Sequence, residues 1–77
     1  MEDKKLLLEI ANLHASEINL RMKDNLSWDD RKNLNDIYKK IDELEKQYKE
    51  NYGALPEWET PEDVQNAINE LSREVQL

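Results

Sequence analysis

Two long stretches of helical periodicity follow each other in this sequence with almost nothing between them. The first covers residues 3–24 and the second begins at residue 28. Only Asn25 and Leu26 are left before Ser27, a residue type that commonly caps helix N-termini. Because so short a link brings consecutive helices back to back, it predicts a long antiparallel helical hairpin.

The second helix is predicted over residues 28–52. Ser27 and Asp30 form a pair resembling a capping box at its start, and Gly53 follows its end. Its apolar residues recur at intervals of three and four, which is the heptad pattern of a coiled coil. These residues are Leu34, Ile37, Ile41, Leu44 and Tyr48.

A shorter third helix is predicted over residues 61–76, with Thr60 as its N-cap and Pro61 in its first turn. It is expected to return along the hairpin after the seven-residue loop 53–59. The single Gly and two Pro among 77 residues argue against a β-rich chain of many turns. The fold prediction is therefore all-α: one domain over residues 1–77, a three-helix bundle that a larger oligomeric bundle can incorporate.

The first helix is apolar around an unusually large part of its circumference. At about 100° per residue, its apolar side chains cover an arc of roughly 200°, twice the usual stripe of a surface helix. They are Leu6, Leu7, Ile10, Ala11, Leu13, Ile18, Leu20 and Met22. This arc predicts more than one neighbour for the helix, and self-association is an efficient way to supply one, most often as a two-fold dimer.

Three polar residues fall within this apolar arc: His14, Glu17 and Arg21. Charged side chains are seldom buried without a partner, so a Glu17–Arg21 pair is expected, with the Tyr38 hydroxyl of the second helix as the nearest donor. The three can flank the arc with their charged ends in water, or form a polar seam that another chain covers. His14 and Glu17 also have ligand-like spacing, but the absence of a second His, of Cys, of a nucleophile and of a phosphate loop predicts no metal, no cofactor and no enzyme.

The two tryptophans have two readings each. Trp28 and Trp58 can close the ends of the bundle, or they can anchor an interface, where Trp is enriched. The candidate interface residues are His14, Glu17, Ile18, Arg21, Met22, Trp28, Tyr38 and Trp58.

The formal charge of −7 is concentrated near the C-terminus. Residues 57–77 hold one arginine and six acidic residues, namely Glu57, Glu59, Glu62, Asp63, Glu70 and Glu74. A chain without a basic stripe is not expected to bind nucleic acid directly. These carboxylates are either a solvated helix face or an imitation of duplex phosphates that occupies a nucleic-acid-binding protein.

The favoured function is a non-enzymatic protein-binding module, of inhibitor or adaptor type, that self-associates through the first helix. The alternatives are the acidic nucleic-acid mimic and a structural or designed bundle without a partner. The N-terminal residues offer only three consecutive leucines, too few for a signal peptide or a membrane span. A cytoplasmic protein without membrane contact is therefore expected.

Overall fold

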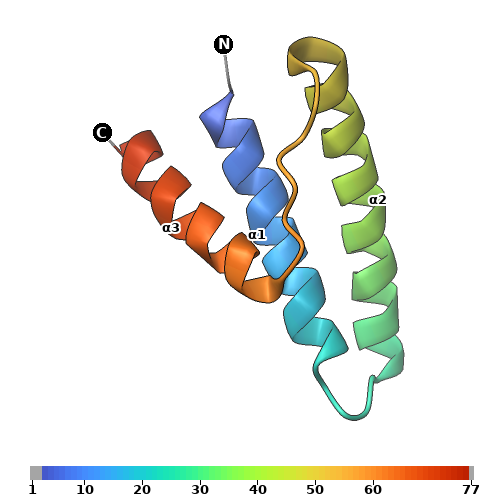
Figure 1. Cartoon of the computed structure of the whole chain (residues 1–77). Coiled ribbons are helices and arrows are strands. Elements are labelled where there is room, and N and C mark those ends of the chain that lie inside the picture. Colours follow the sequence, from blue (N-terminus) through green and yellow to red (C-terminus); the bar gives the residue numbers. More distant parts are fainter. Residues whose placement is uncertain (1–2, 77) are drawn as a thin grey trace.

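The computed structural model describes residues 3–76 and is all-α (Figure 1). Its three helices are α1 (Lys4–Arg21), α2 (Trp28–Tyr52) and α3 (Pro61–Gln76). The predicted fold class is confirmed, and the second and third helices have the predicted bounds. Residues 1, 2 and 77 of the predicted domain lie outside the described part of the chain.

Each helix begins at a side chain that satisfies its first backbone N–H groups. The Asp3 carboxylate accepts a hydrogen bond from the backbone N–H of Leu6 at 3.1 Å. At α2 the predicted capping box is complete, since Ser27 and Asp30 each accept a bond from the other's backbone N–H. The same reciprocal pattern joins Thr60 to Asp63 at α3. These caps explain why the helix starts can be read from the sequence.

The end of α1 differs from the prediction. The helix stops at Arg21, three residues before the predicted end, so the link to α2 has six residues instead of two. The backbone N–H of Lys23 bonds to the carbonyl of Leu20, three residues back, and this tightened turn breaks the helical pattern. The hairpin is nevertheless antiparallel, as Figure 1 shows.

The direction of α3 is the second difference. The connector, residues 53–60, runs back beside the hairpin in extended form, and α3 then points the opposite way to α1 (Figure 1). An ion pair of 3.3 Å between Lys4 and Glu74 joins the start of α1 to the end of α3. Gly53 allows this path because its φ of +98° is a conformation that L side chains rarely adopt. Eight extended residues reach about 25 Å, enough to make the return that the helix was expected to make.

The helices do not form a closed triangle. α1 packs against both α2 and α3, whereas within residues 3–76 those two helices make no contact with each other. The core is correspondingly small and centres on Leu6, Leu7, Ile10 and Tyr48, against which Leu55 and Trp58 of the connector are packed. The radius of gyration, 13.2 Å, exceeds the roughly 11.5 Å of a compact chain of this length.

Candidate functional site

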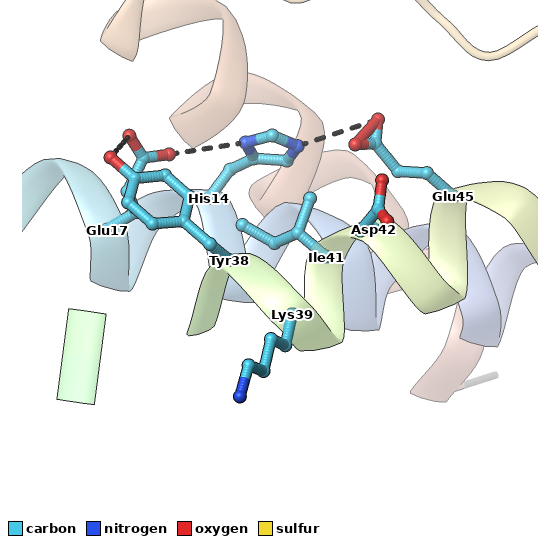
Figure 2. Close-up of a pocket in the computed structure, with 7 residues that line it drawn as sticks. All are labelled: His14, Glu17, Tyr38, Lys39, Ile41, Asp42 and Glu45. Atoms are coloured by element: carbon cyan, nitrogen blue, oxygen red, sulfur yellow. Dashed lines mark hydrogen bonds and ion pairs between the residues drawn. The ribbon is translucent and has the colours of Figure 1, made fainter. Parts of the chain in front are cut away.

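The polar seam predicted from the sequence exists and has Glu17 at its centre (Figure 2). Glu17 is 9% exposed and is the one buried charged residue of the described chain. Its Oε1 atom accepts hydrogen bonds from the Arg21 guanidinium at 3.1 Å and from the Tyr38 hydroxyl at 3.2 Å. Both contacts were predicted. Because Tyr38 belongs to α2, the second bond fixes the level at which the two helices of the hairpin meet.

His14 lies between two carboxylates in this seam. Figure 2 shows its ring between Glu17 of the same helix and Glu45 of α2. The Nδ1 atom is 3.7 Å from Glu17 and the Nε2 atom is 4.0 Å from Glu45, so both are ion-pair distances and too long for hydrogen bonds. Trp58 of the connector meets the His14 ring edge-on, with centroids 6.0 Å apart. The connector thus covers one side of the seam.

The electrostatics of the seam favour the charged form of Arg21. The hydrogen bond to Glu17 is the main cause that raises the pKa of Arg21 above its usual value, and Tyr38 adds to it. Its guanidinium end reaches solvent, since the Arg21 side chain is largely exposed while Glu17 is not. The seam therefore neutralises a buried carboxylate with a partner that remains hydrated.

The chemistry available to the seam is limited to such pairing. The carboxylate oxygen of Glu17 already has two donors, and among residues 3–76 no group of three His, Asp or Glu side chains is arranged to hold a metal ion. The hollow beside His14, about 520 Å³ in volume, is a shallow surface depression lined by Tyr38, Ile41 and acidic side chains. The geometry assigns the seam a structural role, which is to join α1 to α2.

A second feature, not singled out from the sequence, lies on the other side of the hairpin. Here α1 and α2 enclose an open groove of about 620 Å³ that neither α3 nor the connector covers. Its floor is apolar and formed by Leu13 and Leu20 of α1 and Ile37 of α2. We refer to this surface as the open groove. Its rim is polar and consists of Asn33, Asp36, Lys39, Lys40 and Glu43.

The sequence did carry a signal for the open groove. Leu13 and Leu20 are at one extreme edge of the 200° arc of α1, and Ile37 lies on the flank of the heptad pattern. An apolar arc wider than its neighbours can cover must be exposed at an edge, but the sequence does not show at which one. Glu45, opposite His14, was also missed; it lies seven residues, or two turns, after Tyr38 on the same side of α2.

The other interface candidates are dispersed. Met22 and Trp28 are 75% and 74% exposed near the hairpin turn, so the interpretation of Trp28 as a residue packed into the end of the bundle is wrong. The Lys32 ammonium lies over the Trp28 ring at 5.7 Å. Ile18 is half-buried and does not line the open groove. Trp58 packs on the core, as its end-closing interpretation predicted.

The six acidic residues of the last third do not act as one charge array. Asp63 caps α3, and Glu74 pairs with Lys4 across the helices. The remaining four are exposed. They are Glu57, Glu59, Glu62 and Glu70. An imitation of duplex phosphates requires a regular, free array, which two locally engaged members weaken.

Comparisons with protein families, with curated proteins and with solved structures found no match for this chain. No helix among the described residues combines the length and the apolar character that crossing a lipid bilayer requires. Function therefore has to be argued from the surfaces of the molecule itself.

Proposed function

We propose that this chain is a small non-enzymatic protein-binding module, of inhibitor or adaptor type, that self-associates through the open groove beside α1. The observation that supports the proposal is the uncovered apolar floor formed by Leu13, Leu20 and Ile37. Apolar side chains gathered in a groove with a polar rim are typical of protein interaction surfaces. A cytoplasmic location stays a prediction from the sequence.

The exposed area supports association. The chain exposes 5982 Å², whereas a compact monomer of 9.2 kDa exposes about 4,900 Å². The excess is about 1,000 Å², comparable to the roughly 800 Å² that each partner buries in a stable interface of standard size. One helical hairpin covered on a single side also has little core, and packing two hairpins together is the usual way that such chains complete a bundle.

The test is the molar mass in solution, measured by light scattering after size exclusion over a range of concentrations. We expect the native chain to be a concentration-dependent dimer. A Leu20→Glu variant places a carboxylate in the groove floor, so it should shift the midpoint of dissociation to at least tenfold higher concentration. Circular dichroism should show that the variant retains its helices, because Leu20 is only half-buried in the monomer.

Met22→Glu is the matched control, since Met22 is on the same helix, is 75% exposed and lies outside the groove. It should leave the dimer unchanged. A native chain that stays monomeric at all concentrations would contradict self-association. Dissociation caused by Met22→Glu and not by Leu20→Glu would place the interface on the opposite edge of the arc of α1.

A further inference from the structure

We infer that the open groove is filled by the same groove of a second copy, with a two-fold axis passing near Ile37 and with Asp36 of each copy facing Lys40 of the other. This inference rests on the proposed self-association and adds its geometry. The product is a four-helix bundle made from two hairpins, in which both copies of α3 lie on the outside.

The first argument is the symmetry of the groove lining. In antiparallel packing about a two-fold axis, a residue at a given distance before the axis faces the residue at the same distance after it. The lining residues of α2 extend from Asn33 to Glu43, so their midpoint is at Tyr38. About this midpoint Asp36 faces the position of Lys40, and Asn33 faces the position of Glu43.

The second argument is that α1 has its midpoint at the same level. Leu13 and Leu20, the two groove residues of α1, are centred between positions 16 and 17. The hydrogen bond from the Tyr38 hydroxyl to Glu17 shows that this part of α1 lies beside position 38 of α2. A single axis therefore relates both helices to their copies, so that Leu13 of one copy packs on Leu20 of the other.

The third argument is charge. The chain carries −7 overall, and a second copy would be repelled by a uniformly acidic surface. The groove rim instead has two acidic and two basic residues: Asp36, Glu43, Lys39 and Lys40. A rim with both signs in equal number complements itself, whereas a strongly basic or acidic partner would gain nothing there.

The test uses two charge reversals, Asp36→Lys and Lys40→Asp. Each variant alone would place like charges opposite each other at two positions in a dimer, so each should dissociate at a concentration at least tenfold above that of the native chain. An equimolar mixture should form a heterodimer, because every facing pair is then of opposite charge. The double variant Asp36→Lys/Lys40→Asp should dimerise alone within about threefold of native strength. Masses are measured by light scattering, with circular dichroism to confirm folding.

Lys46→Asp and Glu50→Lys are the matched controls, because both residues are exposed on α2 four positions apart and outside the groove. Neither change should alter the mass. If Leu20→Glu dissociates the dimer while both groove reversals leave it intact, the groove is the interface but this axis is wrong. A mixture of the two reversals that stays monomeric also overturns the pairing. A monomeric native chain overturns the inference together with the proposed function.

Discussion

The two sides of the α1–α2 hairpin are built from similar apolar residues but have different fates. On one side the connector lays Leu55 and Trp58 over the core, and the Glu17 seam links the helices beneath it. On the other side Leu13, Leu20 and Ile37 remain at the floor of an open groove. The difference follows from the connector, which has only eight residues and can follow one side of the hairpin alone.

This contrast shows how a short chain distributes its covering elements. A core that is closed on one side gives a unique fold, because the polar groups buried there are paired and set the level of α2 against α1. The side left open has no buried polar group to satisfy, and its charged residues are confined to the rim. A surface of that kind can be covered by another molecule without breaking any hydrogen bond described here.

The largest effect expected from testing this contrast comes from the two tryptophans. Trp58→Ala removes the residue that covers Ile10 and contacts His14, so it should lower the free energy of unfolding by about 2 kcal/mol, half of a fully buried Trp. Trp28→Ala, at a site that is 74% exposed, should change it by less than about 0.5 kcal/mol. Urea unfolding at one fixed protein concentration measures both. Equal losses would mean that the connector does not close its side of the hairpin.

An intermediate effect is expected at the seam. Glu17→Gln and Tyr38→Phe should each cost about 1 kcal/mol, and their double-mutant cycle should give a coupling of about 0.5–1 kcal/mol, since the two side chains share a hydrogen bond. Tyr52→Phe is the control, because the bond from Tyr52 to Asp3 is exposed and 3.4 Å long. A coupling near zero would show that the seam does not hold the two helices in register.

The smallest effect concerns the turn that both sides share. The backbone N–H of Ser27, followed by its hydroxyl and by Lys23, keeps the pKa of Asp30 below its ordinary value of 3.8. Folding therefore favours the ionised carboxylate, and the stability that it contributes is complete above pH 3.8 and is lost as the pH falls through the lower, folded-state pKa. We expect Asp30→Asn to lower the melting temperature by a few degrees at about pH 7, and by progressively less below pH 3.8. Thermal melts followed by circular dichroism at several pH values check this; a constant difference would assign the effect to packing.

The features that the sequence predicted correctly are local ones. The bounds of α2 and α3 followed from Ser27, Thr60 and Gly53, whose roles depend on neighbours within a few residues. The Glu17–Tyr38 bond followed from helical geometry and from a hairpin turn placed nearly correctly. The end of α1 was missed because no Gly or Pro marks it, and a tightened turn at Lys23 has no distinctive composition.

The features that were missed depend on the path of the connector. Nothing in residues 53–60 states that they run back along the hairpin, and this path decides which edge of the apolar arc of α1 is covered. The open groove, and with it Leu13, Leu20 and Ile37, could not be selected before that path was known. The width of the arc predicted an uncovered surface but not its position.

The absence of contact between α2 and α3 has a consequence for how the chain acquires its structure. α1 and α2 are neighbours in sequence and need only a six-residue turn to meet, whereas α3 must close a loop of about 40 residues to reach α1. Contacts close in sequence form faster than distant ones, so the hairpin is the natural folding nucleus and α3 docks afterwards on one partner only. In the reverse direction, α3 can detach and expose Leu7 and Ala11 while the hairpin stays paired, which makes this helix the first unit expected to open.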